Sequence, residues 1–348
     1  EIIIPGNNLT GTFPLTDSLT RVRFIDLADN ALTGIEDLTG LDALTDLDVS
    51  QNLFEFDDLE KLRELPSFTY SPQKTRLSFN ETEVADSLLV RVFSYTSLSY
   101  HVGGEYNTYE WFRNKSLIEN GNEFFAADTL LEILSIDYNS MGKFEAEVRN
   151  DSLPDLRIPV DSMFVFAVAD LTVDVNDNDG ELIPEDVDGY LLLTTQVDKG
   201  FDTLNIAKKQ PSSFTFIDVI LGDYLVSIDS DPSKYIPTYY SDAFEWIEAD
   251  TVLFRKDSAF QVSMTVIPGE LNGVGTLEVL IEEDFGDENG RIDARRRAAK
   301  RKCGLRRKTG GGRTGQDNDQ YELIAYGETD ENGEFKFGFL PEGEYRFF

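Results

Sequence analysis

A short pattern of apolar residues and asparagine recurs at a nearly fixed spacing over the first 66 residues. The pattern occurs three times, as Ile2-x-Ile4-x-x-Asn7, Ile25-x-Leu27-x-x-Asn30 and Leu47-x-Val49-x-x-Asn52. The asparagines are 23 and then 22 residues apart, and such a period indicates stacked copies of one structural unit. Alternate apolar residues on a short strand would point into the stack, and the asparagine amide would bond the turning backbone.

The residues upstream complete a known pattern. Leu19 and Val22 precede the second copy, and Leu41 and Leu44 precede the third, which gives L-x-x-L-x-x-L-x-L-x-x-N. This resembles a leucine-rich repeat. The resemblance implies the end of a solenoid over residues 1–66, closed by a capping turn at 57–66. Because so few repeats are unstable alone, we expect further repeats before residue 1.

Residues 67–165 change to an alternating pattern typical of short β-strands. The candidate strands are TRLSF, SLLVRVFSY, TYEWFRN, LLEILSI and KFEAEVRN, and their spacing predicts a β-sandwich. The segment resembles an immunoglobulin-like domain, with Trp111 as its central tryptophan, Phe144 in the place of the corner tyrosine and Ala146 in the place of a cysteine. A chain with one cysteine has no internal disulfide. The core would therefore depend on Trp111, and we expect it to unfold independently of the repeats.

Two further segments, 166–268 and 269–348, share strand and turn patterns. The first contains DLTVDVNDNDGELIPED and closes with LGDYLVSI, and the second contains TDENGEFKFGFLPEGEYRF. Both resemble carboxypeptidase-regulatory-like and collagen-adhesin B-type repeats, which implies two prealbumin-like β-sandwiches. In the second, Asp330–Gly333 predict a tight hairpin turn. We interpret this last module as truncated, with a basic insertion at 291–313.

The supply of reactive side chains argues against an enzyme. His101 and Cys303 are the single histidine and cysteine, whereas a zinc site normally needs three or four such ligands. A serine or cysteine nucleophile needs a nearby histidine. Carboxylate pairs are numerous, but the sequence has no phosphate-binding loop, nucleophile elbow or HExxH motif. We predict no catalytic residue and no required cofactor.

The charge balance limits the class of partner. Lys and Arg number 31 against 65 Asp and Glu, for a net charge of −34. Such a chain disfavours nucleic acid and anionic membranes. Its longest apolar stretch, Met163–Ala169, is far too short to be a transmembrane segment. These features favour protein partners or copies of the same chain.

One basic stretch departs from this balance. Residues 291–313 hold 11 of the 31 basic residues and one acid, Asp293. We predict that it contacts an acidic surface of a neighbouring module or subunit, because arginine suits bidentate pairing with carboxylates. A polyanion-binding patch, a solvated loop that balances the preceding EEDFGDE and a short helix are the alternatives. The candidate contact residues are Arg295, Arg296, Arg297, Lys300, Arg301, Lys302, Arg306 and Arg307.

A second candidate site is a broken calcium loop. Asp177, Asp179 and Asp186 occupy the third, fifth and twelfth positions of an EF-hand-type loop, with Gly180 at the sixth. Val175 stands at the first position, where an acid is required. The segment therefore predicts either a hairpin turn without metal or weak Ca²⁺ binding by these oxygens.

Taken together, the resemblances cover nearly the whole chain. They are similar to the mosaics of large bacterial adhesins and surface-layer or filament proteins exported by type IX secretion. The resemblance implies a non-catalytic, extracellular structural or adhesive segment. The alternatives are an ancillary region of a secreted hydrolase and a polyanion-binding protein acting through 291–313.

Overall fold

The chain folds almost entirely into β-strands, in two compact units, Glu1–Ala169 and Asp170–Phe348. The computed structural model describes residues 1–14, 20–36, 41–79, 86–177, 179–183, 186–193, 203–206, 210–211, 213–230, 234–243, 248–266, 273–286, 292–297, 301–310 and 320–347. Within these residues the α-helix is α1 (Phe56–Glu60). No helix of the described part has the length and apolar character that crossing a bilayer requires.

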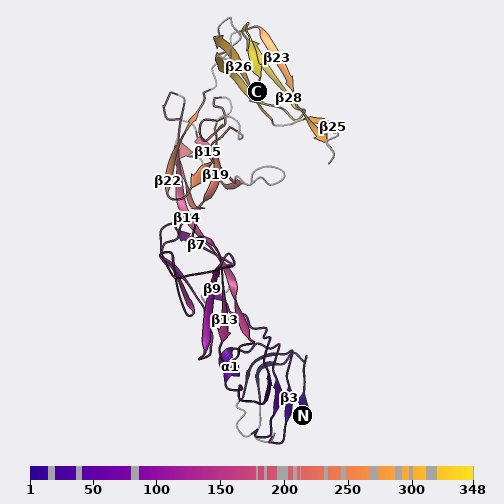
Figure 1. Cartoon of the computed structure of the whole chain (residues 1–348). Coiled ribbons are helices and arrows are strands. Elements are labelled where there is room, and N and C mark those ends of the chain that lie inside the picture. Colours follow the sequence, from indigo (N-terminus) through magenta and orange to yellow (C-terminus); the bar gives the residue numbers. More distant parts are fainter. Residues whose placement is uncertain are drawn as a thin grey trace. The chain divides into compact units, whose positions relative to one another are not determined.

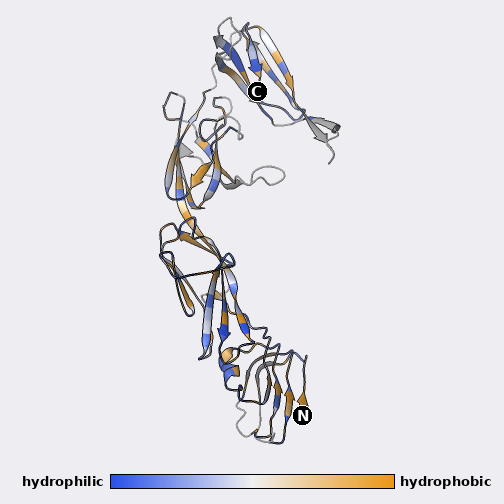
Figure 2. Cartoon of the chain, viewed as in Figure 1, coloured by the Kyte–Doolittle hydropathy of each residue, from blue (hydrophilic) through white to orange (hydrophobic). Residues whose placement is uncertain are grey.

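The first unit begins with a parallel sheet (Figure 1). Its strands, in spatial order, are β1 (Ile2–Ile3), β3 (Phe24–Asp26), β5 (Asp46–Asp48) and β6 (Ser67–Thr69). A second parallel pair follows two of them along the chain, β2 (Thr10–Phe13) and β4 (Ala31–Ile35). Ile25, Leu27, Leu47 and Val49 are at most 2% exposed, so the apolar alternation faces inward as the sequence predicts. Figure 2 shows hydrophobic colouring along the stacked strands near the N-terminus.

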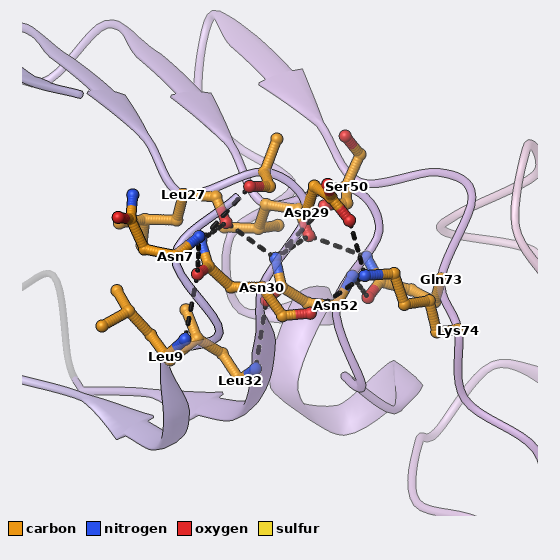
Figure 3. Close-up of polar contacts among 12 residues, drawn as sticks. Asn7, Leu9, Leu27, Asp29, Asn30, Leu32, Ser50, Asn52, Gln73 and Lys74 are labelled. Atoms are coloured by element: carbon orange, nitrogen blue, oxygen red, sulfur yellow. Dashed lines mark hydrogen bonds and ion pairs between the residues drawn. The ribbon is translucent and has the colours of Figure 1, made fainter. Parts of the chain in front are cut away.

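The recurring asparagines bond the backbone of adjacent copies (Figure 3). Asn52 is fully buried. Its Oδ1 accepts from the Leu32 N–H at 3.0 Å, and its Nδ2 donates to the carbonyls of Leu27, Val49 and Ser50 at 2.9–3.1 Å. Asn30 has the same role one copy earlier. Its Oδ1 accepts from the backbone N–H groups of Asn7 and Leu9. The amides thus satisfy backbone groups that the turn would otherwise bury without partners.

The repeat continues for one copy beyond residue 66, where the sequence analysis predicts its end. β6 pairs in parallel with β5 beyond residue 66. Gln73 Oε1 accepts from the Asn52 N–H at 3.1 Å, and its Nε2 donates to the Val49 and Tyr70 carbonyls. Gln73 therefore replaces the asparagine of a fourth copy, whose apolar positions are the aromatic residues Phe68 and Tyr70.

The rest of the first unit is a pair of sheets. The strands of one sheet are β10 (Ser116–Leu117), β9 (Asn107–Arg113), β13 (Gly142–Asn150) and β14 (Arg157–Asp177), with β7 (Ser87–Arg91) parallel to β14. The other sheet consists of β11 (Phe124–Ala127), β12 (Leu130–Ile133) and β8 (Thr96–Ser99). β9 and β13 lie side by side, and Trp111 on β9 is opposite Ala146 on β13.

Trp111 occupies the core between these sheets. It is 2% exposed, its ring lies 5.6 Å from Phe79 and 5.2 Å from Tyr100, and its Nε1 donates to the Asp128 carbonyl at 3.0 Å. Asp128 lies between β11 and β12. The indole on one sheet is therefore hydrogen-bonded to the connection between two strands of the other.

The second unit contains two groups of strands with the same pairing scheme. The first group comprises the end of β14, β15 (Asp186–Leu193), β16 (Thr203–Ile206), β17 (Gln210–Pro211), β18 (Ser213–Ile220), β19 (Gly222–Asp229), β20 (Thr238–Tyr239), β21 (Val252–Phe254) and β22 (Ser258–Met264). The second comprises β23 (Gly275–Leu280), β24 (Glu282–Gly286), β25 (Ile292–Arg297), β26 (Lys302–Gly310), β27 (Gln320–Glu328), β28 (Glu334–Leu340) and β29 (Tyr345–Phe347).

Five strands of each group correspond in their pairing. In the first, β14 neighbours β18, and β15 pairs with both β16 and β19. In the second, β23 pairs with β28, and β26 pairs with both β27 and β29. The chain thus repeats one topology of two small sheets.

A tyrosine marks the same crossing between sheets in both groups. Tyr224 Oη donates to the Ile220 carbonyl at 2.6 Å, where β18 passes to β19. Tyr345 Oη donates to the Pro341 carbonyl, where β28 passes to β29. The spacing of four residues, with glycine two positions before the tyrosine, is the same at both corners.

The Tyr224 corner predicts a loss of stability at alkaline pH. Burial raises the pKa of Tyr224 from 10.0 to about 12, with a smaller contribution from Asp223. When the pKa of a group is higher in the folded state than in the unfolded state, its contribution to stability is complete at pH values below the unfolded-state pKa. That contribution is lost as the pH rises through the folded-state pKa. We expect Tyr224→Phe to cost about 1 kcal/mol at pH 7 and to flatten the decline of stability between pH 10 and 12. Urea unfolding across this pH range measures the free energy of unfolding of both proteins. If that free energy declines with pH as steeply in the variant as in the wild type, the prediction is wrong.

Candidate functional site

The described part of the basic stretch, residues 292–297 and 301–310, contains strands β25 and β26. In β26, Cys303 and Leu305 are at most 1% exposed and pack with Ile324, Phe337 and Leu340 in the core of the last group. β26 therefore belongs to the framework of that module. The density of charge concealed the inward alternation of these two residues.

The first half of the stretch lies opposite acidic residues of its own module. β25 pairs with β24 so that Arg295 is opposite Asp284, Arg296 opposite Glu283 and Arg297 opposite Glu282. The Arg297 guanidinium also lies 2.8 Å from Glu334 Oε1. Arg297 therefore has an acidic partner within its own module.

The remaining candidates are dispersed. Lys302 Nζ lies 3.6 Å from Asp229 Oδ1, and the Arg307 guanidinium donates to the Glu342 carbonyl at 2.7 Å. Arg301 is exposed, and Arg306 is half-buried. Lys300 and Arg291 lie outside the described residues. The structure therefore does not gather these side chains into one described cationic surface.

The calcium candidates lie at a tight turn that occurs twice. Asp177 Oδ1 accepts from the N–H groups of Asp179 at 2.9 Å and Glu181 at 2.8 Å. Asp330 does the same with Asn332 at 2.8 Å and Glu334 at 2.9 Å. Those two bonds, the one from Glu334 first, lower the pKa of Asp330 below its ordinary value. Both carboxylates thus serve as acceptors for the turn's own backbone.

Both turns are tight and are closed by backbone groups. Asn176 and Leu182 form an isolated antiparallel bridge across the first turn. In the second, the Gly333 N–H donates to the Asp330 carbonyl at 3.0 Å, and the flanking strands β27 and β28 pair with other strands. The side chain of Asp186 lies outside the described residues. Among the described acidic, cysteine and histidine side chains, no group of three is placed to hold a metal. Calcium binding remains a prediction.

The single cysteine and the single histidine differ in exposure, since Cys303 is buried and His101 is exposed. Burial, with a smaller contribution from Glu328, raises the pKa of the Cys303 thiol to about 11. A thiol with this pKa is not a nucleophile near neutral pH. His101 is exposed in the loop that precedes Gly103.

That loop takes part in a buried polar site, the Glu60 junction (Glu55, Glu60, Gly103–Tyr106 and Asn150). Glu60, at the end of α1, is 9% exposed. Its carboxylate accepts from the Glu105 N–H at 3.0 Å, the Tyr106 N–H at 3.3 Å and the Asn150 side-chain amide. Glu55 Oε2 accepts from the Gly103 N–H at 2.9 Å. The junction joins the end of the repeats to two strands of the sandwich.

The glycines of the loop permit this contact. Gly104 has a φ of +118°, and a Cβ added there would lie 2.8 Å from the Phe56 Cβ. A Cβ on Gly103 would lie 2.4 Å from Asp57. Only glycine lets the loop approach α1 so closely. Sequence reasoning missed this site, although HVGGEY carries the signal in its paired glycines.

No family model matches this chain, and no curated protein matches it. Three solved structures that are similar in part are a chain of the mouse coronavirus receptor-binding domain complexed with its murine receptor, the Bacillus anthracis TIE protein and the Dscam1 Ig7 domain, isoform 9. Their identities are 14%, 11% and 19%, with TM-scores of 0.23, 0.29 and 0.20.

The coverage of these matches is uneven. They cover 29%, 78% and 26% of this chain, and 48%, 49% and 92% of the respective structures. The chain therefore spans about half the length of the first two. TM-scores of this size do not establish a shared fold.

Proposed function

We propose that this chain is a non-catalytic structural and adhesive segment of a large secreted bacterial surface protein. Its parts would be the end of a leucine-rich-repeat solenoid, an immunoglobulin-like sandwich and two prealbumin-like modules. The observation that carries the proposal is the Glu60 junction. A buried carboxylate with three donors fixes one module onto the next, as a segment that holds modules in line requires.

The strand orders support the module assignments. β9, β13 and β14 follow the C-F-G order of an immunoglobulin sheet, and β8, β12 and β11 follow the B-E-D order of its partner. The parallel strands with their amide ladder support the repeat. The duplicated two-sheet topology, with its paired tyrosine corners, supports two copies of one module.

One β-strand, β14, includes residues of both units. β14 is a single strand of 21 residues, Arg157–Asp177. Its first part pairs with β13 and β7, and its last part pairs with β22. One strand thus belongs to two successive sandwiches, which favours a structural role over that of an ancillary region tethered to an enzyme.

A flow assay tests the role. Beads that carry the full chain should be retained on protein-coated surfaces, including surfaces coated with the chain itself, more strongly than beads that carry serum albumin. The purified chain should show no turnover in a panel of peptidase and glycosidase substrates. Turnover that is lost when a carboxylate pair is mutated would contradict the proposal, as would retention no greater than that of albumin.

A further inference from the structure

Strand β7 is an edge strand whose outer backbone groups face away from its partner. Among the described strands, β14 is the one that pairs with it. The Asp86 carbonyl accepts from the Phe164 N–H at 2.8 Å, and the Val92 N–H donates to the Val168 carbonyl at 2.9 Å. Because backbone groups alternate sides along a strand, the N–H and carbonyl of Leu89 point toward the open edge.

An apolar strip runs beside this edge. Leu89 is 54% exposed and lies opposite Phe166, whose ring stacks on Phe164 at 6.0 Å and 4°. Phe164 is itself 39% exposed, whereas Val165 between them is buried and faces the core. Residues Ser87–Val90 carry no charge in a chain that is 28% charged. Natural edge strands are usually protected by charges, so an apolar one indicates a partner.

Another edge of the same sandwich shows such protection. Asn120 bonds both backbone groups of Ala126 on β11, with Oδ1 accepting at 2.7 Å and Nδ2 donating at 3.1 Å. A side chain thus occupies the position that a further strand would take. The difference between the two edges makes β7 the better candidate for strand addition.

Several charged residues on the same face of the sheet as the strip lie in ion pairs. Lys143 on β13 is in register with Phe164, so both lie on the outer face of the sheet. The ion pairs on and beside this face are Lys143–Glu145 at 2.6 Å, Arg149–Glu110 at 2.8 Å, Arg149–Glu147 at 2.9 Å, Arg157–Glu147 at 3.5 Å and Arg76–Asp161 at 3.4 Å. Two copies of a chain with a net charge of −34 repel each other, and a face of paired charges is where that repulsion is weakest.

We propose that β7 pairs with β7 of a second copy of this chain, antiparallel about a two-fold axis at Leu89. In this register Leu89 is opposite its own counterpart, Leu88 is opposite Val90 and Ser87 is opposite Arg91. No like charges face each other, and outward residues meet outward residues. The apolar strips of the two copies then form one continuous apolar surface across the axis. Each strip consists of Leu89, Phe166 and Phe164.

The same observations favour a second copy over an unrelated partner. A basic protein would be drawn to the acidic surfaces that dominate the chain, and a face of paired charges has little net charge to attract it. A two-fold interface needs a self-complementary patch, and the register on Leu89 supplies one. The inference names a partner for the proposed structural role and rests on that role.

Site-specific crosslinking of the full chain tests the register. Paired residues that exchange both backbone hydrogen bonds have Cα atoms about 5.5 Å apart, within disulfide range. We expect Leu89→Cys to form a disulfide-linked dimer under mild oxidation. Ser87→Cys is the matched control on the same strand face, because its counterpart lies four residues away, roughly 13 Å. Equal crosslinking of both variants, or of neither, would overturn the proposal.

Light scattering separates this inference from the proposed role. The wild-type chain should dimerise more strongly at high salt, because salt screens the repulsion between copies. Leu89→Lys should be monomeric, whereas Leu253→Lys, at a residue that is 65% exposed on β21, should still dimerise. A monomeric wild-type chain that is retained in the flow assay would overturn the pairing alone. A dimer that is not retained would overturn the adhesive role alone.

Discussion

Trp111→Ala should destabilise the first unit by about 3–5 kcal/mol, the usual cost of removing a fully buried large aromatic side chain. The variant loses the ring contacts with Phe79 and Tyr100 and the hydrogen bond to the Asp128 carbonyl. No disulfide compensates, since Cys303 is the single cysteine. Urea unfolding, followed by the far-UV circular dichroism of the backbone, measures the change in the free energy of unfolding.

Two controls make this result specific. Phe125→Ala removes an aromatic residue that is 46% exposed on β11 and should cost less than about 0.5 kcal/mol. Trp111→Phe keeps an aromatic ring in the core but loses the indole donor, and it should fall between the two. A Trp111→Ala chain as stable as the Phe125→Ala chain would show that the indole is not the centre of the core.

Asn52→Ala should destabilise the repeats by about 3 kcal/mol, because it leaves several buried backbone groups without partners. Its amide serves one N–H and three carbonyls. Asn7→Ala is the matched control at the same position of the first copy, where the side-chain amide makes an exposed bond to the Pro5 carbonyl. The Asn7→Ala control should lower the free energy of unfolding by less than about 1 kcal/mol. Equal losses in the two variants, measured by urea unfolding, would contradict the ladder.

Short sequence patterns predicted the parts of the fold that are set by contacts within one repeat, strand or turn and its regular copies. The asparagine period located the parallel strands, since the amide bonds the turn of its own copy and of the next. Alternation around Trp111 located the sandwich core. The Asp-x-x-Gly pattern located the turn at Asp330, but not the sheets that it joins, because strand pairing is decided by distant contacts.

Other features escaped the sequence analysis for physical reasons. Gln73 is one methylene longer than asparagine yet reaches the same backbone groups, so the fourth copy lacked its marker residue. Cys303 and Leu305 alternate within a run of cations that was interpreted as a basic insertion. The Glu60 junction joins residues 45 and 90 positions apart, and no periodicity reports such a contact.

These contacts alter the expectation that the sandwich unfolds alone. From Gln73 the chain passes directly into sandwich residues. Thr75 Oγ1 donates to the Phe54 carbonyl at 2.7 Å, the Leu77 N–H donates to the Pro159 carbonyl at 3.1 Å, and Phe79 stacks on Trp111. With the Glu60 junction, the repeats and the sandwich share one continuous set of buried contacts. We therefore expect the first unit to unfold in one cooperative step.

Native-state hydrogen exchange of the full chain, in wild type and in Trp111→Ala, tests this central claim most directly. If the repeats and the sandwich are one structural body, amides of β3, β5 and β13 open with the same free energy in the wild type. The substitution then lowers protection in all three strands by the same factor. If β3 and β5 keep wild-type protection while β13 loses it, the modules are independent and the account of a continuous structural segment is wrong.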